Sequence, residues 1–383
     1  MDNIAGKKSA LSWAVHLSVL VLVVLWLLPT AGLFISSFRT ADQIAATGWW
    51  KALFASEQNL ALRTGAPDSA RQAGGLYVIE GNLLEGENPD ARIATWGTTP
   101  RQLDEFKAGE TGTTRDGASL TLKADGSYRM ESPSPFEGKR GERLFAVAKL
   151  PPKFTLANYA RVLFSGNATD SMAKAFFNTL TVTIPATIIP ILIAAYAAYA
   201  LAWMNFPGRA LLIAVVVALL VVPLQLALIP LLKLHLAIGI GKGYLGVWLA
   251  HTGFGLPMAI YLLRNYMAGL PRDIIENARV DGASEFEIFR KIILPLSFPA
   301  LASFAIFQFL WTWNDLLVAK VFLIDATGKT TVMTAQIVEL MGTRGGNWEI
   351  LATAAFVSIA VPLIVFFAMQ KYLVRGLLAG SVK

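Results

Sequence analysis

The residues of this chain that could act on a partner are concentrated in one charged loop, residues 264–298, which lies between two strongly apolar runs. Its centre is Glu-Asn-Ala-Arg-Val-Asp-Gly at 276–282, and Ile292, Leu294 and Pro295 follow. The predicted turn between two short helices lies at the residues Glu276, Ala278, Asp281, Gly282 and Ala283. Side chains of these types make contacts rather than break bonds. The chemistry that we expect here is therefore the docking of another protein.

Polar side chains inside the apolar runs form a second group of candidates: Asn178, Gln225, Gln308, Trp311, Asn314 and Asp315. Polar and ionisable groups inside a membrane are costly and usually face a bundle interior or a water-filled cavity. These residues therefore fit the lining of a polar pathway. They fit equally well a set of hydrogen bonds between helices, and the tryptophan fits an anchor at the membrane interface.

Motifs that would indicate a cofactor or catalytic site are present only in fragments. Gly328-Lys-Thr330 resembles the end of a phosphate-binding loop, but Leu323 stands where the first glycine belongs. Residues 241–246 match G-x-G-x-x-G without the strand and helix that this motif requires. The three histidines are far apart in the sequence, and there is no cysteine. We expect no metal, no cofactor held by this chain, and no catalysis.

The elements that must position these residues are membrane helices. The chain has 383 residues, of which 55% are hydrophobic and only 15% charged, which is too apolar for a soluble globular protein. Six runs approach or exceed the roughly 20 apolar residues that a span requires. They are Leu11–Ser36, Phe176–Met204, Ala210–Leu232, Tyr244–Leu263, Pro299–Leu323 and Ile350–Met369. The predicted fold class is an all-α polytopic membrane protein with six transmembrane helices.

Basic residues indicate how these spans are oriented. With the N-terminus in the cytoplasm, the inner segments carry Lys7, Lys8, Arg209, Arg264, Arg272, Arg279, Arg290, Lys291, Lys371, Arg375 and Lys383. The two short outer loops carry only Lys242, Lys329 and Arg344. Because positive residues concentrate in cytoplasmic loops, both termini and the charged loop are predicted to be cytoplasmic.

Residues 41–152 differ in composition from the rest of the chain. They carry a net charge of −2 while the remainder carries +9, and they are rich in glycine and proline. Asp125-Gly126 between two alternating runs predicts a β-hairpin, and residues 75–79 and 143–148 look like further strands. We expect a β-rich insert on the outer face, between the first span (residues 1–40) and a core of residues 153–383. A loop without regular structure is the alternative.

Local signals within the charged loop are consistent with a pair of short helices. Leu270-Pro271 fits the start of the first helix, and Gly282 allows a sharp turn. Ser284 and Glu287 match a capping box for the second helix. Phe286, Phe289 and Ile293 fall on one face at helical spacing, and Pro295 is expected to end that helix.

The spacing in this loop resembles the EAA motif in permease subunits of binding-protein-dependent ABC importers. The pattern of this motif is E-A-A, three residues, G, nine residues and I-x-L-P. Six positions match it, namely Glu276, Ala278, Gly282, Ile292, Leu294 and Pro295, and Asn277 departs from it. Further stretches resemble the smaller permease of maltose-type importers: residues 34–39, 154–159, 177–179, 311–315, 370–376 and 379–383. The start at residues 29–50 and the large insert resemble α-glucoside importer permeases.

The resemblance implies a role, partners and a location. Glu276 would contact an ATPase subunit, Ala278 and Ala283 would allow close packing, and Gly282 would keep the bend. The partners would be a second permease, two cytoplasmic ATPases that bind ATP and Mg, a periplasmic sugar-binding protein and membrane lipid. The location would be the bacterial inner membrane, with residues 41–152 periplasmic. Amides, a carboxylate and aromatic rings in the spans would suit a sugar pathway.

Two other classes of protein remain as alternatives. An ion-coupled secondary carrier needs buried ionisable relays and usually inverted repeats, whereas this chain offers one such carboxylate and no visible repeat. A membrane-anchored sensor or scaffold would use the outer insert as its working part. A DNA-binding helix-turn-helix, and nucleic acid as a partner, are disfavoured because the loop is tethered at both ends to membrane spans and its charges are mixed.

Overall fold

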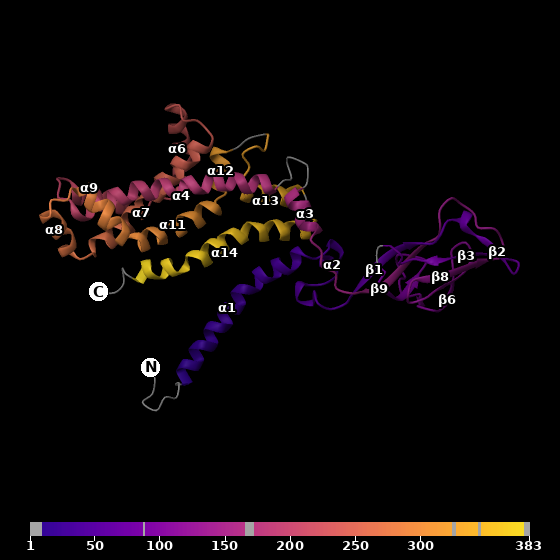
Figure 1. The fold of residues 1–383 in the computed structure, drawn as a ribbon. Coiled ribbons are helices and arrows are strands. Elements are labelled where there is room, and N and C mark those ends of the chain that lie inside the picture. Colours follow the sequence, from indigo (N-terminus) through magenta and orange to yellow (C-terminus); the bar gives the residue numbers. More distant parts are fainter. Residues whose placement is uncertain (1–9, 87–88, 165–171, 324–326, 344–345, 379–383) are drawn as a thin grey trace. The chain divides into compact units, whose positions relative to one another are not determined.

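The computed structural model describes residues 10–86, 89–164, 172–323, 327–343 and 346–378, which fall into two compact units. One unit contains the N-terminal part of the chain up to Asn158, together with Asn347–Ala352, and the other contains most of the remainder. Figure 1 shows a β-rich part and a helical part. The predicted inner residues Lys7, Lys8 and Lys383, and the family-like tail at 379–383, lie outside the described residues.

The N-terminal unit begins with a long apolar helix, α1 (Ala10–Ser37). Most of its side chains are exposed and apolar on every face, as expected for a helix whose solvent is lipid. A short helix α2 (Ala41–Ala46) and a 3₁₀ turn η1 (Trp49–Lys51) follow. They lead into the β-rich insert, which is present as the sequence predicted.

The insert consists of two antiparallel sheets. The first has the order β1 (Ser56–Arg63), β9 (Arg143–Leu150), β4 (Arg92–Gly97) and β5 (Phe106–Lys107). The second has the order β2 (Arg71–Ala73), β3 (Leu76–Asn82), β8 (Ser127–Ser132), β7 (Ser119–Leu122) and β6 (Thr111–Thr113). A 3₁₀ turn η2 (Pro67–Ser69) lies between β1 and β2. The expected hairpin is β7–β8, with Gly126 at φ +83°.

One apolar core holds the two sheets together. Trp96 and Leu144 come from the first sheet, Ile79, Leu120 and Leu122 from the second, and all five are buried in one cluster. Alternation along β9 turns every second residue inward, as the period of a strand requires. The insert therefore has the internal core of an independent β-sandwich rather than that of an unstructured loop.

The second unit is helical, and Figure 1 shows its long helices side by side. Its helices up to the charged loop are α3 (Ala157–Phe164), α4 (Met172–Trp203), α5 (Arg209–Leu219), α6 (Leu224–Ala237) and α7 (Tyr244–Ala268). The loop contains α8 (Arg272–Val280), α9 (Glu285–Ile288), the π-helix η3 (Phe289–Ile293) and α10 (Leu294–Leu296). The last helices are α11 (Phe298–Trp313), α12 (Leu317–Phe322), α13 (Met333–Thr343) and α14 (Trp348–Leu378).

The structure replaces six uninterrupted spans with a mixture of long and bent helices. Four helices are long and apolar enough to span a membrane by themselves: Leu11–Ser37, Met172–Trp203, Tyr244–Ala268 and Trp348–Tyr372. The third predicted span is a bent pair, α5 and α6, at 110° to each other. Pro223 lies at this break, where a residue without an N–H group cannot continue the helical hydrogen bonds. Six spans result if each bent pair is counted as one.

The fifth predicted span, Pro299–Leu323, is also interrupted. Its helix α11 ends at Trp313, and α12 begins only at Leu317. At the other end, the chain bends by 70° between Leu296 and Phe298. Asp315 therefore lies in a break between helices rather than within a continuous span, where its carboxylate can accept hydrogen bonds from free backbone N–H groups.

Candidate functional site

The turn of the charged loop is formed by the residues that the sequence indicated. Gly282 adopts φ +82°, a left-handed conformation that glycine accepts at little cost. The N–H of Ala283 donates to the carbonyl of Ala278 at 3.0 Å, which closes the end of α8. Pro271 is the N-cap of α8 rather than a residue of its first turn. The two helices are thus joined by a turn with defined geometry.

The predicted capping box of the second helix is confirmed. Ser284 Oγ accepts from the N–H of Glu287 at 3.3 Å, and the Glu287 carboxylate accepts from the N–H of Ser284 at 3.1 Å. Lys291 Nζ lies 3.0 Å from the same carboxylate. The hydrogen bond from Lys291, followed by those from Ser284, lowers the pKa of Glu287 to about 2. The carboxylate is therefore ionised and holds the start of α9 throughout the neutral range.

In α9 and in the residues that follow it, the structure departs from two predictions. Phe286 was expected on one face with Phe289 and Ile293, but it is 57% exposed while the other two are buried. Residues 289–293 form a π turn, which changes the angular spacing of side chains, and Ile288 takes the inward position instead. Pro295 does not end the helix, which continues to Leu296 before the bend at Ser297.

A hydrogen-bonded network ties the charged loop to two long helices. Arg279 Nε donates to Glu285 at 2.9 Å, and the hydroxyl of Tyr199 on α4 donates to the same carboxylate. Arg279 also donates to the carbonyl of Trp203 at 3.3 Å. Trp203 Nε1 donates to the carbonyl of Met267 on α7 at 3.0 Å. These bonds therefore link α8 and α9 to the ends of α4 and α7.

Most of this network is not predicted by the sequence. No local pattern indicates a role for Glu285, Tyr199 or Trp203, and Arg279 indicates only the orientation of the loop. Arg279 and Glu285 lie six residues apart across a glycine turn, so only a correct model of that turn would have paired them. Tyr199 and Trp203 are four residues apart near the end of α4, a spacing that places them on one helix face.

The two faces of the helix pair have different character. Ile275 and Ile288 are buried in the helical core, and Ala278 and Ala283 pack against it half-buried. Ile292 and Leu294 are also half-buried, whereas Asp281 and Pro295 are exposed. Small side chains at 278 and 283 thus allow the loop itself to lie close to its own core.

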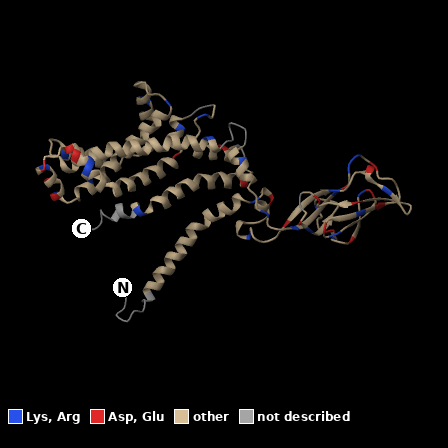
Figure 2. Cartoon of the chain, viewed as in Figure 1, with Lys and Arg blue, Asp and Glu red and all other residues tan. Residues whose placement is uncertain are grey.

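The exposed part of the loop presents carboxylates, among them Glu276, together with apolar groups. Glu276 is exposed, and among the described residues none forms an ion pair or hydrogen bond with its side chain. The exposed apolar residues of the loop include Val280, which is 86% exposed, and also Ile274 and Phe286. Figure 2 shows charged residues gathered around α8 and α9, in contrast to the long helices, which carry few charges. This surface has the composition of a site that is covered by another protein.

Among the polar candidates within the spans, Asn178 connects helices. Asn178 uses its whole amide: Nδ2 donates to the carbonyls of Lys329 and Thr331, both at 2.9 Å, and Oδ1 accepts from the hydroxyl of Tyr244 at 2.9 Å. It joins α4 to α7 and to the segment before α13. This arrangement is the hydrogen bonding between helices that was the alternative to a pathway.

Gln308 is buried and likewise connects helices. Its Nε2 donates to the carbonyl of Ala186 on α4 at 3.1 Å and to that of His251 on α7 at 3.4 Å. A Cβ atom on Gly255 would lie 2.7 Å from Gln308 Oε1, so glycine is needed there for the amide to fit. Gln308 is therefore placed to hold three helices together.

The remaining candidates lie at helix breaks. Asp315 Oδ2 accepts from the N–H of Ala319 at 3.1 Å, which caps α12, and lies 3.8 Å from His251 Nε2. Asn314, exposed at the end of α11, donates to the carbonyl of Leu310 at 2.8 Å. Gln225 is exposed immediately after the break at Pro223, and Trp311 is exposed with its ring edge toward His251.

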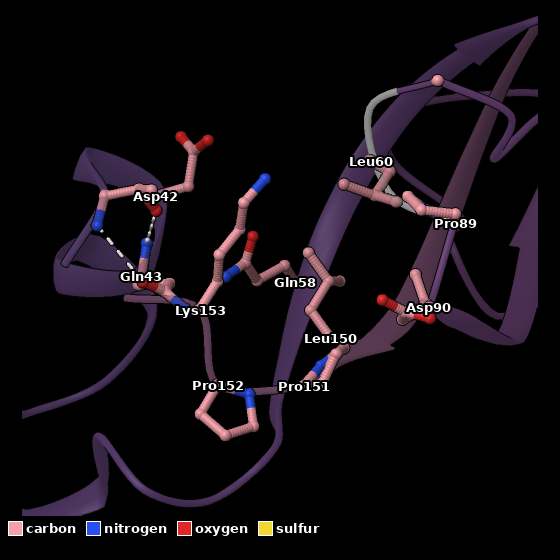
Figure 3. A pocket seen from close by; sticks show the side chains of 13 residues that line it. Asp42, Gln43, Gln58, Leu60, Pro89, Asp90, Leu150, Pro151, Pro152 and Lys153 are labelled. Carbon is pink, nitrogen blue, oxygen red and sulfur yellow. Dashed lines mark hydrogen bonds between the residues drawn. The ribbon is translucent and has the colours of Figure 1, made fainter. Parts of the chain in front are cut away.

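The N-terminal unit contains a cavity near α2, with a volume of about 560 Å³ (Figure 3). Asp42, Asp90 and Lys153 contribute charges to its walls, and Leu60 and Leu150 contribute apolar surface. Within the described ranges, no group of three or more acidic, histidine or cysteine side chains could hold a metal ion.

Comparison with known proteins gives consistent results over the whole chain. A family model described as "Binding-protein-dependent transport system inner membrane component" matches residues 171–378. The alpha-glucoside transport system permease protein AglG of Rhizobium meliloti is 60% identical over 99% of both chains. The osmoprotective compounds uptake permease protein GgtD of Synechocystis is 58% identical over 60% of this chain and 76% of its own. The trehalose transport system permease protein SugB of Mycobacterium tuberculosis is 34% identical over 61% and 84%, respectively.

Proposed function

We propose that this chain, which belongs to the family of binding-protein-dependent transport system inner membrane components, is the permease subunit of an ATP-driven importer for α-glucosides or related oligosaccharides. The observation that carries this proposal is the 60% identity to an alpha-glucoside permease over 99% of both chains. An ion-coupled carrier and a sensor are not favoured, because the family and these relatives are transport permeases.

The extent of the matches supports the assignment of substrate class. The alpha-glucoside relative matches through the β-sandwich as well as the helices, whereas the relatives for osmoprotective compounds and trehalose match about 60% of this chain. A match of that extent is close to the length of the helical core alone. We therefore infer that the β-sandwich is a feature shared with the α-glucoside permease and not a feature of the permease fold in general.

The charged loop is the proposed site of coupling. The carboxylate of Glu276 and the exposed side chains of Val280 and Phe286 would contact a cytoplasmic ATPase subunit, which binds ATP and Mg. The network of Arg279 and Glu285 would then pass motion to α4 and α7. ATP acts in such a cycle through its different affinities for the inward- and outward-facing states. This chain contributes contacts and a pathway, not chemistry.

The complete importer would contain a second permease, two ATPase subunits and a periplasmic sugar-binding protein. The chain would lie in the bacterial inner membrane with both termini cytoplasmic and residues 41–152 periplasmic. Of the polar candidates, Gln225, Trp311 and Asn314 are exposed, so they remain available to a sugar in the pathway. Asn178, Gln308 and Asp315 support the helices around it.

A crosslinking experiment tests the proposed coupling site, and the absence of cysteine makes it simple. A single cysteine is placed by Val280→Cys, because this side chain is the most exposed apolar group of the loop. In native membranes we expect a crosslink to a nucleotide-binding subunit, with a yield that changes when ATP is added. The partner is identified by mass spectrometry.

Gln72→Cys on β2 is the matched control, since it is equally solvent-exposed but lies in the insert. It should give no crosslink to the ATPase subunit. Free labelling of Val280→Cys from the cytoplasm, without any crosslinked partner, would show that the loop is not a docking site.

A further inference from the structure

Large apolar side chains are exposed where the chain leaves α1 for the β-sandwich. Trp50 is 67% exposed, Leu53 75% and Phe54 68%, all within or just after η1. The returning chain exposes Phe154 and Leu156 just before α3. We call these five residues the collar. Their exposure is unlike that of the sandwich, whose large apolar residues pack inward.

Both connections are held against the outer end of α1. In the outgoing one, Trp49 packs on α1 where Gly32 lacks a side chain: a Cβ there would lie 2.8 Å from Trp49 Nε1. In the returning one, the N–H of Thr155 donates to the carbonyl of Phe38 at 2.8 Å. Asn158 Nδ2 donates to the carbonyls of Ser37 and Arg39 at 2.9 and 2.8 Å.

A buried arginine fixes the short path between α1 and η1. Arg39 donates to the carbonyl of Gln43 at 2.6 Å and to that of Thr47 at 3.0 Å. The same guanidinium donates to the hydroxyl of Thr47 at 2.6 Å. These bonds hold α2 and the start of η1 in one arrangement, so the position of the collar along α1 is set by packing and hydrogen bonds.

The length of α1 places this position near the membrane surface. A helix of 28 residues is about 42 Å long, whereas the hydrocarbon core is about 30 Å thick. Because α1 ends in the polar residues Ser36 and Ser37, this end of the helix extends into the headgroup region. Gly32, which receives Trp49, lies five residues before the end of α1 and hence close to the boundary between acyl chains and headgroups.

We propose that the collar is a lipid-binding surface that inserts into the outer leaflet of the membrane around α1. Tryptophan, phenylalanine and leucine with neighbouring lysine are typical of segments that lie in this interface. Lys51 and Lys153 are exposed beside the collar residues in the sequence and can face the lipid phosphates. The surface continues the apolar, exposed side of α1, which is itself embedded in lipid. Membrane lipid is therefore the occupant.

A depth measurement on the full-length chain tests this inference. Leu53→Cys is labelled with an environment-sensitive fluorophore, and the protein is reconstituted into vesicles of phosphatidylethanolamine and phosphatidylglycerol. We expect a blue-shifted emission, strong quenching by lipids that carry a nitroxide near the headgroup, and weak quenching by iodide. Leu156→Cys, on the returning connection, should behave in the same way.

Gln72→Cys on the sandwich is the control, and it should be quenched by iodide and not by nitroxide lipids. Quenching of Leu53→Cys by iodide alone would show that the collar faces water. Protection from both quenchers in the assembled importer would show that a protein subunit covers it. Either of these outcomes overturns the proposal, and neither depends on the substrate or on the coupling site.

Discussion

The β-sandwich buries its large apolar side chains in a core of its own, whereas the charged loop buries some of its large apolar side chains and leaves others exposed. Trp96 is fully buried and lies 4.6 Å from Phe106, ring centre to ring centre, within a core that the insert completes by itself. Val280 and Phe286 are exposed, and the small residues Ala278 and Ala283 face the protein instead. One region buries its apolar side chains within itself, and the other leaves part of its apolar surface exposed.

Because of this difference, we expect substitutions in the sandwich to change stability and substitutions on the exposed part of the loop to change function. The sandwich is held by apolar burial, so its loss of structure should be a local event. The loop is held by apolar residues buried in the helical core, such as Ile275 and Ile288, and by polar links, namely Arg279 with Glu285 and the capping box at Ser284. Changes on its outward face should therefore leave the protein folded while removing coupling, and changes to its links should have smaller, graded effects.

The largest effect is expected from reversing the charge of the outward face. Glu276→Lys replaces the carboxylate proposed to contact the ATPase subunit and should abolish sugar uptake, because like charges in a contact are repelled. The protein should remain in the membrane at normal abundance, since Glu276 makes no described contact inside the chain. Uptake of labelled α-glucoside and immunoblotting of membranes measure the two quantities.

Glu85→Lys makes the same change in charge on the sandwich and serves as the control, with uptake expected to be near normal. If Glu276→Lys transports normally, the carboxylate has no part in coupling. If Glu85→Lys fails equally, net charge rather than position explains the loss.

An intermediate effect is expected from a large-to-small substitution in the core of the sandwich. Trp96→Ala should destabilise the insert by about 3–5 kcal/mol, the usual cost of replacing a buried tryptophan by alanine. Limited proteolysis in membrane vesicles should then cleave within residues 56–150, while the helical unit stays intact and the ATPase subunit still co-purifies.

The exposed residue Arg71 provides the control for this experiment, because Arg71→Ala should leave the protease resistance unchanged. Loss of the ATPase subunit from the Trp96→Ala protein would mean that the sandwich also stabilises the helical unit. The comparison between a self-contained and a partner-dependent region would then fail.

The smallest effect is expected from the cap of α9. Ser284→Ala removes the hydroxyl that accepts from the N–H of Glu287 and should cost about 1 kcal/mol of local helix stability. Hydrogen exchange of the amides in α9 should become faster in this variant. Ser284→Thr keeps a hydroxyl and should restore the wild-type rate, so equal exchange in all three proteins would contradict the role of the cap.

The pH dependence of this cap follows from the Glu287 carboxylate. Its pKa in the folded protein, about 2, lies below its ordinary value of 4.5, so the ionised form is favoured by folding. Its contribution is present above the ordinary value and is lost as the pH falls toward 2. Hydrogen exchange in α9, corrected for the intrinsic rate, should therefore be constant from about pH 5 to about pH 8.

Predictions from the sequence succeeded where the signal was local. The hairpin at Asp125-Gly126, the left-handed turn at Gly282 and the capping box of Ser284 and Glu287 depend on neighbouring residues, and each is found in the structure. The β-rich insert and the helical permease class were also recognised. The roles of Glu276 and of the pathway residues stay predictions.

Predictions failed where the outcome depended on packing between distant segments. Phe286 fits the inward face by spacing alone, but the π turn at residues 289–293 moves Ile288 inward instead. The third and fifth apolar runs are continuous in composition, yet both are interrupted in the structure. Hydropathy measures how apolar a segment is, and it does not show where the backbone stops forming its hydrogen bonds.

The sequence by itself determined the class of protein, the position of the insert and the local turns, because hydropathy, glycine and capping residues act within a few positions along the chain. Only the tertiary structure decided which polar groups meet. Asn178 reaches the carbonyls of Lys329 and Thr331, about 150 residues away, and Tyr199 reaches Glu285 across 86 positions. Such partners are chosen by the packing of whole helices, whose arrangement is set by many apolar contacts together and by no single motif.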